Sequence, residues 1–196
     1  MKVNVFLNGE YFLGNINSAE KNIACDGAYK YCIEKGIKLD AVVGDFDSLG
    51  YEPSGAVKYE REKDFTDGEG AVEFVKSFAS EINFYNFGGK REDHFFGNIS
   101  LLIKCNKLGI KSKGITNYSE IIYSEDCVSL KNVKGKTISI VPFSKKAHII
   151  NGVGLKYSIK DVVFSQEETL GISNEAIEDI VEFKIIQGSV LVFVNY

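Results

Sequence analysis

The chain has no excess of basic residues, and this absence argues against one class of partner. Among its 196 residues, 23 lysines and arginines stand against 27 aspartates and glutamates, so the formal net charge is −4. A surface that binds nucleic acid needs a basic patch or stripe. The sequence therefore predicts no nucleic-acid partner, whereas the small negative charge is compatible with a cationic small substrate.

Long apolar runs and paired cysteines are also absent. No run approaches the length of a membrane span, and the apolar stretch at residues 1–7 is too short for a signal peptide. The four cysteines, Cys25, Cys32, Cys105 and Cys127, have neither the spacing of a zinc site nor the density of a disulfide scaffold. We therefore expect a cytoplasmic protein with reduced, mostly buried thiols and no membrane partner.

The first part of the chain alternates between two kinds of pattern. Short apolar runs that predict strands occupy residues 3–7, 22–25, 41–43, 56–59 and 82–87. Three helices are expected. The first lies at residues 27–35, the second begins at a capping box formed by Thr66 and Glu69, and the third lies at about residues 95–108. Strands that alternate with helices are typical of an α/β domain with a mostly parallel, Rossmann-like sheet and helices on both faces.

The pattern changes after about residue 115, where long helical periodicity ends. Short β-rich runs follow at residues 120–123, 127–130, 137–141, 161–164, 180–186 and 190–194. The pair Gln187-Gly188 lies between two alternating apolar segments, which predicts a tight hairpin. We therefore expect an all-β sandwich in the second part, and divide the chain into domains at residues 1–114 and 115–196.

The most informative motif of the first domain is Gly44-Asp45-Phe46-Asp47-Ser48, which follows an apolar segment. On a strand, the side chains of residues i and i+2 point to the same face. Two such carboxylates repel each other unless a cation or a proton lies between them. Mg²⁺ takes oxygen ligands and usually binds through one or two carboxylates together with substrate phosphates. An acidic turn after the strand is the simpler alternative.

Two more charged clusters follow at similar intervals. They are Lys63-Asp64-Phe65-Thr66-Asp67 and Arg91-Glu92-Asp93-His94, and each lies between an expected strand and an expected helix. In an open α/β sheet, ligands bind where the carboxyl ends of the strands meet helix N-termini. The spacing therefore predicts one ligand site built from all three clusters.

Together with other segments, these clusters carry a family resemblance. The matching segments, in order, are Cys25-Asp26-Gly27, residues 44–48, 63–67, 91–98, 154–157 and 171–175. With them, the chain resembles the thiamine pyrophosphokinase family, also called thiamine diphosphokinases. It departs from the family pattern in having Cys25 and Ala28 around Asp26-Gly27, and Lys90 where a second glycine is usual. Gly68 and Gly70 also weaken the start of the helix after Asp67, by roughly 1 kcal/mol each relative to alanine.

The resemblance implies a reaction and roles for the charged residues. ATP and thiamine would give thiamine diphosphate and AMP, with Mg²⁺ as cofactor and ATP as co-substrate. It implies that Asp45, Asp47 and Asp67 bind the metal and that these three act in catalysis with Arg91. The residues implied to contact the nucleotide are Asp26, Lys63, Thr66, Arg91, Asp93 and His94.

The same resemblance assigns the second domain to thiamine. In the family this region is a β-sandwich, and the thiamine pocket forms between two subunits, so a homodimer is implied. Tyr157 would stack on the rings, because an aromatic face attracts the thiazolium cation. Ser173 and Asn174 would hydrogen-bond the pyrimidine edge. The simpler alternative has Tyr157 as a half-buried strand residue and Ser173-Asn174 as a turn.

Several of these residues have structural alternatives. Thr66 and Glu69 would cap a helix in either case. Lys63 beside Asp64 would contribute little as a solvated surface pair. His94 opens an apolar helix face and would also serve as a hydrogen-bonded core histidine, and His148 has no motif around it, which favours a structural role.

Three other functions are open to the same motifs. A pyrophosphokinase for another heterocycle, such as a hydroxymethylpterin, would share the acidic core, but residues 171–175 argue against it. A non-catalytic thiamine or nucleotide sensor would be expected to lose a metal carboxylate or Arg91, and the chain keeps them. A phosphatase with an aspartate nucleophile usually has Gly-Thr or a similar pair after its second aspartate, whereas Ser48-Leu49 follows here.

Overall fold

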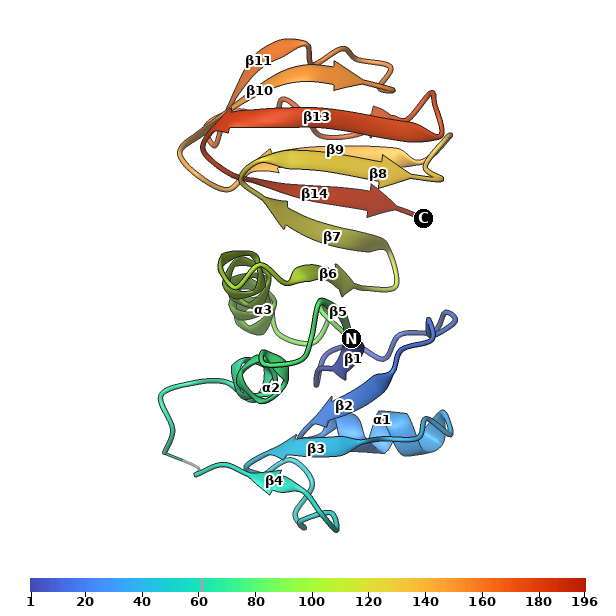
Figure 1. The fold of residues 1–196 in the computed structure, drawn as a ribbon, viewed down its shortest axis with the longest axis vertical. Coiled ribbons are helices and arrows are strands. Elements are labelled where there is room, and N and C mark those ends of the chain that lie inside the picture. Colours follow the sequence, from blue (N-terminus) through green and yellow to red (C-terminus); the bar gives the residue numbers. More distant parts are fainter. Residues whose placement is uncertain (61) are drawn as a thin grey trace. The chain divides into compact units, whose positions relative to one another are not determined.

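The computed structural model describes residues 1–60 and 62–196 and divides the chain into two compact units (Figure 1). The first unit is Met1–Asn117 and the second is Tyr118–Tyr196. The expected boundary after residue 114 falls inside a strand of the first unit, β6 (Lys111–Ile115). Within the described residues, no helix has both the length and the apolar character needed to cross a membrane.

Six strands form the sheet of the first unit. They are β1 (Lys2–Phe6), β2 (Lys21–Cys25), β3 (Ala41–Gly44), β4 (Val57–Lys58), β5 (Glu81–Tyr85) and β6. They pair in parallel in the order β4-β3-β2-β1-β5-β6. The order reverses at β1, so the chain leaves β1 toward one edge and returns through β5 on its other side. A reversal of this kind opens a crevice at the carboxyl ends of the strands.

Three helices accompany these strands: α1 (Ala28–Glu34), α2 (Asp67–Val75) and α3 (Glu92–Lys107). The connections from β1 to β2 and from β3 to β4, residues 7–20 and 45–56, are described in full and contain no helix. The predicted α/β domain is confirmed in its coarse form. The Rossmann-like description does not match well, because a doubly wound sheet carries a helix in nearly every crossover.

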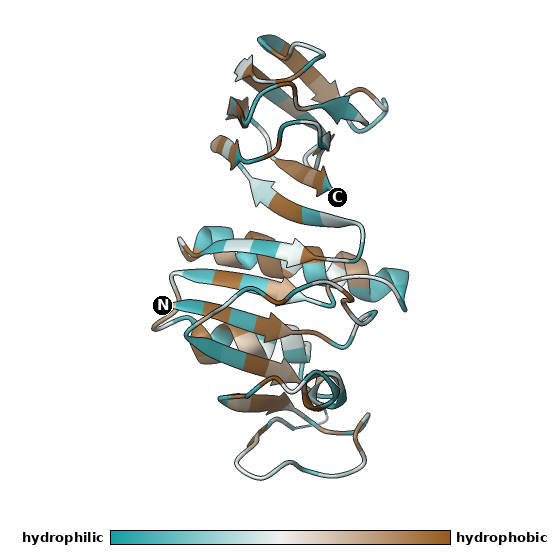
Figure 2. Cartoon of the chain, turned by 90° about the vertical axis from the view of Figure 1, so that its right-hand side faces the viewer, coloured by the Kyte–Doolittle hydropathy of each residue, from teal (hydrophilic) through white to brown (hydrophobic). Residues whose placement is uncertain are grey.

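The core of the first unit follows from side-chain alternation along the strands. Phe6 and Tyr85 are register partners on β1 and β5, and their rings stack with centroids 5.3 Å apart. They belong to a buried cluster that includes Ala28 and Tyr31 of α1. Helices α2 and α3 pack together on the other side of the sheet (Figure 1). Hydrophobic residues recur along these strands and on the adjacent helix surfaces (Figure 2).

Close packing explains one of the glycines at the start of α2. A Cβ atom at Gly70 would lie 2.4 Å from the Tyr59 ring, and the Tyr59 hydroxyl donates a hydrogen bond to the Gly70 carbonyl at 2.9 Å. Gly70 therefore lowers the helix propensity of α2 but allows close contact between this helix and the segment that carries Tyr59.

The second unit is β-rich. Its strands are β7 (Ser119–Ser124), β8 (Cys127–Lys131), β9 (Thr137–Pro142), β10 (Lys146–Val153), β11 (Asp161–Ser165), β12 (Asn174–Glu175), β13 (Ile180–Gln187) and β14 (Val190–Asn195). One group pairs in the order β12-β9-β14-β7 and the other in the order β11-β10-β13-β8, all antiparallel. Buried residues of both groups form one apolar cluster, as in a sandwich.

The hairpin predicted at Gln187-Gly188 is wrong. β13 pairs with β10 and β8, whereas β14 pairs with β7 and β9. The turn between them therefore passes the chain from one sheet to the other. Alternation of apolar residues on both sides of a turn is common to a hairpin and to a sheet-switching corner, because both bury one face of each strand.

Three strands and the start of one helix also differ from what was expected. β6, β10 and β12 were not predicted, and α3 begins at Glu92 rather than at about residue 95. β6 has the sequence Lys-Ser-Lys-Gly-Ile, which is polar for most of its length. Its pairing with β5 depends on tertiary context rather than on β propensity.

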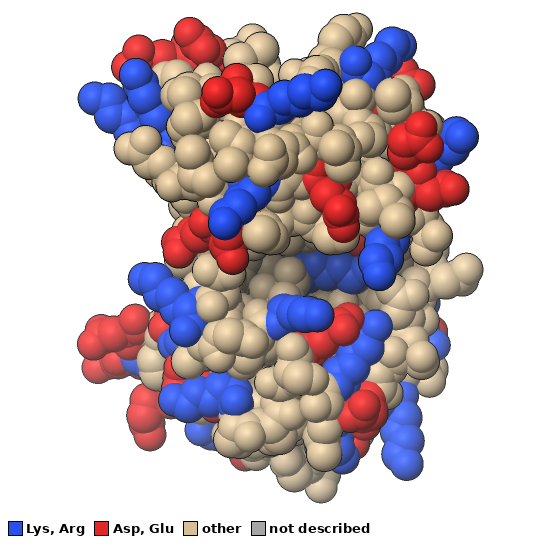
Figure 3. Space-filling view, turned by 45° about the horizontal axis from the view of Figure 1, so that its top comes forward, with Lys and Arg blue, Asp and Glu red and all other residues tan. Residues whose placement is uncertain are grey.

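Charged side chains of both signs share the molecular surface. On the face shown in Figure 3, lysine and arginine side chains are interspersed with aspartate and glutamate. A local group of charges lies in a cavity of the first unit.

Candidate active site

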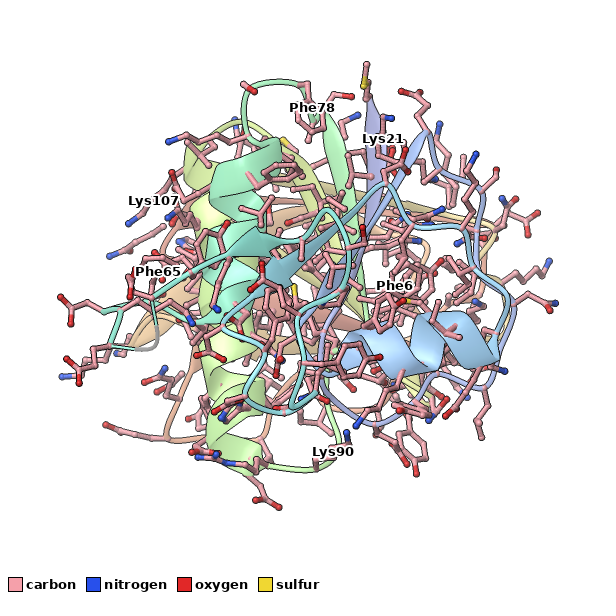
Figure 4. All side chains as sticks on the ribbon, turned by 90° about the horizontal axis from the view of Figure 1, so that it is seen from below. Phe6, Lys21, Phe65, Phe78, Lys90 and Lys107 are labelled. Carbon is pink, nitrogen blue, oxygen red and sulfur yellow. The ribbon has the colours of Figure 1, made fainter. Side chains whose placement is uncertain are left out.

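The cavity lies at the carboxyl ends of the parallel strands and has a volume of about 710 Å³. Its lining comes from the residues that follow β1, β2, β3 and β5, and from the N-terminal turns of α2 and α3. All three charged clusters predicted from the sequence reach it, together with Asp26. Figure 4 shows one of its lining residues, Lys90, near the N-terminal end of α3, with Lys107 at the other end of that helix.

Three carboxylates meet in this cavity: Asp26 after β2, Asp45 after β3 and Asp67 at the start of α2. One oxygen from each lies within 4.8 Å of the others. Gly44 makes this approach possible, because a Cβ atom there would lie 3.0 Å from the Cβ of Asp26. Asp26 itself is 4% exposed and has a left-handed φ of 42°. A buried carboxylate in a sparsely populated backbone region is typical of a functional position.

Lys63 compensates part of this negative charge. Its Nζ lies 3.0 Å from Asp45 Oδ2 and 3.0 Å from Asp67 Oδ1. The Lys63 side chain is 8% exposed, so the alternative of a solvated surface pair with Asp64 is wrong. Burial lowers the pKa of Lys63, but its contacts with Asp67 and Asp45 outweigh burial and raise that pKa overall. Lys63 is therefore a cation of the site at neutral pH.

The carboxylates still lack some of the donors that their burial calls for. Asp26 Oδ1 is buried without a hydrogen-bond donor, and the buried Asp67 Oδ1 has the Lys63 ammonium 3.0 Å away as an ion-pair partner. Burial raises the pKa of Asp67; Lys63 lowers it, and Asp45 and Asp26 raise it further. Carboxylate oxygens that lie close to one another, with the buried Asp26 Oδ1 lacking a donor, fit a hard divalent cation such as Mg²⁺.

Asp47 lies outside this group, although it lines the same cavity. It is exposed, its backbone amide donates to Asp45 Oδ1 at 3.2 Å, and its Oδ1 accepts from the Ser48 hydroxyl at 3.2 Å. The strand ends at Gly44, and Phe46 has a left-handed φ of 63°, so Asp45 and Asp47 do not continue as strand neighbours. The structure thus groups Asp26, and not Asp47, with Asp45 and Asp67.

Thr66 caps α2, as predicted. Its hydroxyl oxygen accepts a hydrogen bond from the Glu69 backbone amide at 3.2 Å. The second half of the predicted capping box is wrong, because the Glu69 carboxylate instead pairs with Lys104 of α3 at 2.9 Å. Thr66 also lines the cavity, so its cap places the first turn of α2 against the site.

Arg91, Asp93 and His94 lie together at the start of α3. The Arg91 guanidinium binds both Asp93 carboxylate oxygens, through Nη2 at 2.6 Å and Nε at 3.1 Å. Arg91 lowers the pKa of Asp93, and the same contact raises the pKa of Arg91. His94 is exposed, so the alternative of a core histidine is wrong. All three residues line the cavity, and Arg91 and His94 can offer donors to a ligand there, whereas Asp93 accepts from Arg91.

Two further cavity residues were not assigned a role from the sequence. Lys90 Nζ donates to Asn8 Oδ1 at 3.2 Å and lies 5.4 Å from the Tyr11 ring centroid. Asn8 also approaches the Ser48 hydroxyl at 3.5 Å. Lys90 was visible only as a departure from the family motif, and Asn8 follows β1 without a charged neighbour that would mark it.

In the second unit, Tyr157, Ser173 and Asn174 form a local group. Asn174 Oδ1 accepts from the Tyr157 amide at 3.0 Å, and Asn174 Nδ2 donates to the Tyr157 carbonyl at 2.8 Å. The Tyr157 side chain is 64% exposed, which excludes a half-buried strand residue. Ser173 has a left-handed φ of 58°, and its amide donates to Ser139 Oγ. The Asn174 amide is therefore occupied by the backbone and holds Tyr157 in place.

His148, which was expected to be structural, pairs with Asp161 across the β10–β11 ladder. His148 Nε2 lies 2.6 Å from Asp161 Oδ1. The free cysteines also agree with expectation: Cys25, Cys32 and Cys105 are buried thiols, and Cys127 is exposed.

Comparison with known families divides the chain in a similar way. Residues 13–113 match the model described as "Thiamin pyrophosphokinase, catalytic domain". Residues 125–190 match the model described as "Thiamin pyrophosphokinase, vitamin B1 binding domain". The two matches together span most of the sequence.

Individual relatives agree with the family models. A protein of Bacillus subtilis (strain 168) named thiamine pyrophosphokinase is 30% identical over an alignment of 167 residues, and the match covers 80% of this chain and 78% of that protein. The crystal structure of thiamine pyrophosphokinase from Bacillus subtilis has a TM-score of 0.87 and 25% identity, covering 100% of this chain and 99% of the other. That of Geobacillus thermodenitrificans has a TM-score of 0.86 and 22% identity, covering 100% and 98%.

Proposed function

The chain belongs to the thiamin pyrophosphokinase family, and we propose that it transfers the pyrophosphoryl group of ATP to the hydroxyethyl oxygen of thiamine, giving thiamine diphosphate and AMP. One observation carries the proposal beyond family membership. A single cavity is lined by the carboxylate group Asp26, Asp45 and Asp67, by Lys63 within that group, and by Arg91. A metal–triphosphate ligand needs both kinds of charge.

Mg²⁺ is the metal that we place at this site. Asp26, Asp45 and Asp67 would hold it, with Asp47 at the cavity wall as a further oxygen donor beside the phosphates. The buried Asp26 Oδ1, which has no hydrogen-bond donor, and the short distances among the three carboxylates support this assignment. When bound, Mg²⁺ neutralises and orients the phosphate oxygens.

The cationic and polar side chains around the carboxylates would bind the nucleotide. Arg91 offers a planar fork that matches phosphate oxygens, and Asp93 orients it through their two-point contact. Lys63 offers a more mobile charge, and Thr66 positions the first amides of α2 toward phosphate. His94, also exposed at the cavity, is proposed to contact the nucleotide.

The transfer itself needs positioning and one proton acceptor. The thiamine hydroxyl oxygen attacks the β-phosphorus, the bond from that phosphorus to the α,β-bridging oxygen breaks, and AMP leaves. A carboxylate of the group accepts the hydroxyl proton.

We assign the thiamine site to the second unit and to a homodimer interface. Exposure of the Tyr157 ring supports a stacking role, and Ser173 lies beside Asn174 at the same place. Val153 and Ile177 are also about half exposed, and their segments are joined by the Leu155–Ala176 bridge. Exposed apolar residues on adjoining segments support burial against a second copy of the chain. Static light scattering of the purified protein tests the dimer.

A product analysis tests the reaction. Purified protein is incubated with ATP, Mg²⁺ and thiamine, and the products are separated by chromatography. The proposal expects AMP and thiamine diphosphate in equal amounts, both requiring thiamine. ADP with thiamine monophosphate would overturn pyrophosphoryl transfer, and folded protein without any thiamine-dependent product would overturn the function.

A cytoplasmic location is part of the proposal and is supported by the free thiols.

A further inference from the structure

Lys63 lies inside the acidic group, not at the rim of the cavity. Its Nζ is 3.0 Å from an oxygen of Asp45 and 3.0 Å from an oxygen of Asp67, and its side chain is 8% exposed. The ammonium also lies 6.0 Å from the Tyr59 ring centroid and 5.9 Å from that of Phe65. Lys63 is thus held among the atoms that are proposed to bind the metal.

A lysine in this place and a divalent cation compete for the same oxygens. A metal bound to Asp45 and Asp67 at about 2.1 Å would lie within about 5 Å of the Lys63 ammonium, if the ammonium kept its contacts. Two cations that close repel each other strongly in a partly buried site. The acidic group of the free protein is therefore poorly prepared for a metal, although the buried Asp26 Oδ1 lacks a hydrogen-bond donor.

A nucleotide changes this balance, because it offers Lys63 other anionic oxygens. The lysine side chain is long and flexible and carries its charge at one atom, so it can exchange a carboxylate for a phosphate without moving the backbone. Asp67 lies at the N-terminus of α2, where phosphate oxygens would also meet the first amides of the helix. A triphosphate bound at the N-terminus of α2 would therefore lie next to the position that the Lys63 ammonium occupies in the free protein.

We propose that Lys63 makes metal binding conditional on the nucleotide. In the free protein its ammonium occupies Asp45 and Asp67 in place of a divalent cation. When the triphosphate binds, Lys63 moves onto phosphate oxygens and releases both carboxylates to the metal. This inference rests on the proposed function, since it uses the metal and nucleotide of that reaction. It makes Lys63 a positioning residue for the metal, in addition to a phosphate contact.

The proposal has a thermodynamic signature that does not involve turnover. If the nucleotide raises the affinity for metal by some factor, the metal raises the affinity for nucleotide by the same factor. Removing the Lys63 charge should make the acidic group available without nucleotide. Metal binding would then become tighter in the absence of nucleotide and less dependent on its presence.

The test measures binding of Mn²⁺, whose free concentration can be followed by electron paramagnetic resonance. Wild type, Lys63→Met, Lys63→Arg and Lys107→Met are titrated without nucleotide and with α,β-methylene-ATP, in which the reacting bridge is carbon. Lys107→Met removes the same charge from an exposed site at the far end of α3 (Figure 4). Lys63→Met should bind Mn²⁺ at least tenfold more tightly than wild type without nucleotide. Lys63→Arg and Lys107→Met should resemble wild type.

Other outcomes decide against the proposal in distinguishable ways. Equal or weaker Mn²⁺ binding by folded Lys63→Met, without nucleotide, would overturn the competition and leave the metal site in place. No Mn²⁺ binding by any of the proteins, even with α,β-methylene-ATP, would overturn the metal site and with it the magnesium part of the proposed function. Circular dichroism checks folding, and Lys63→Gln replaces Lys63→Met with the same expectation if the latter does not fold.

Discussion

The side chain of Asn174 holds the backbone of Tyr157 by two hydrogen bonds, one to its amide at 3.0 Å and one from Asn174 Nδ2 to its carbonyl at 2.8 Å. Asn174 is 5% exposed, whereas the Tyr157 ring is 64% exposed. The buried Asn174 side chain therefore fixes the backbone from which the exposed Tyr157 ring projects. This arrangement gives Asn174 a supporting role for Tyr157, in addition to the contact with the pyrimidine that was predicted for it.

Asn174→Ala should raise the KM for thiamine about tenfold, which corresponds to about 1.4 kcal/mol, with a smaller effect on the KM for ATP. It should also lower the free energy of unfolding by about 1–3 kcal/mol, because buried backbone groups lose their partners. Asn195→Ala is the matched control, since Asn195 makes a single bond to the Thr137 carbonyl at 3.2 Å. Tyr157→Ala and the double variant complete a cycle, and additive effects on thiamine would show that the two residues act independently.

Asp26→Asn should make the protein more stable and inactive. The Asp26 carboxylate is buried next to Asp45 and Asp67, its Oδ1 has no hydrogen-bond donor, and its charge raises the pKa of Asp67. Asparagine removes the repulsion and tolerates the left-handed backbone at this position. We expect a gain of roughly 1 kcal/mol in metal-free protein, measured by urea unfolding, together with loss of turnover.

The opposite result for Asp26→Asn is also informative. A variant that is less stable than wild type, with or without Mg²⁺, would mean that the carboxylate has a structural partner. Thermal unfolding with and without Mn²⁺ provides the control, because loss of a ligand should abolish the stabilisation that the metal gives wild type.

Asp47→Asn should separate activity from stability in a different way. Asp47 is exposed and lies outside the buried carboxylate group, so its replacement should change the free energy of unfolding by less than about 0.5 kcal/mol. Turnover should nevertheless fall by about 100-fold or more, because Asp47 faces the cavity where charge develops in the reaction. Asp45→Asn is the comparison, and it should lower both quantities, since it also breaks the 3.0 Å contact with Lys63. Near-normal turnover by Asp47→Asn would remove Asp47 from the site.

The carboxylate site shows what the sequence could and could not predict. Asp45 and Asp67 were found because each directly follows or opens a recognisable element. Asp47 was placed with Asp45 by assuming that the strand continues, but it ends at Gly44 and the chain turns at Phe46. Asp26 joins Asp67 across 41 positions of sequence, and no local pattern reports which acid faces which across a parallel sheet.

The second unit shows the same limit in its topology. Short strands with alternating burial were predicted at β13 and β14, and both exist. The predicted pairing of β13 with β14 was wrong, because an alternating strand buries one face equally well in either sheet of a sandwich. The choice is made by the buried residues of both sheets together, such as Phe183 of β13 and Val192 of β14 in one cluster, and those contacts are far apart in the sequence.

A final prediction concerns acid stability and the contact between α2 and α3. Glu73 of α2 pairs with Lys104 of α3 at 2.6 Å and also with Lys76. The hydrogen bond from Lys104, followed by that from Lys76, lowers the pKa of Glu73 from 4.5 to about 2. A carboxylate with a lowered pKa in the folded state stabilises the protein fully above its unfolded pKa, and this contribution is lost as the pH falls toward about 2. Because the Glu73 side chain is 42% exposed, the contribution is screened and should be below about 1 kcal/mol.

Glu73→Gln should therefore be slightly less stable than wild type at pH 7, and the difference should shrink between about pH 4.5 and pH 2. Urea unfolding at a series of pH values measures this, with the same substitution at the exposed Glu167 of the second unit as the control. High salt should reduce the difference at pH 7, since screening weakens an exposed pair. A difference that is constant from pH 7 to pH 2, or that grows at low pH, would mean that Glu73 stabilises the helix contact through packing of its side chain and not through its charge.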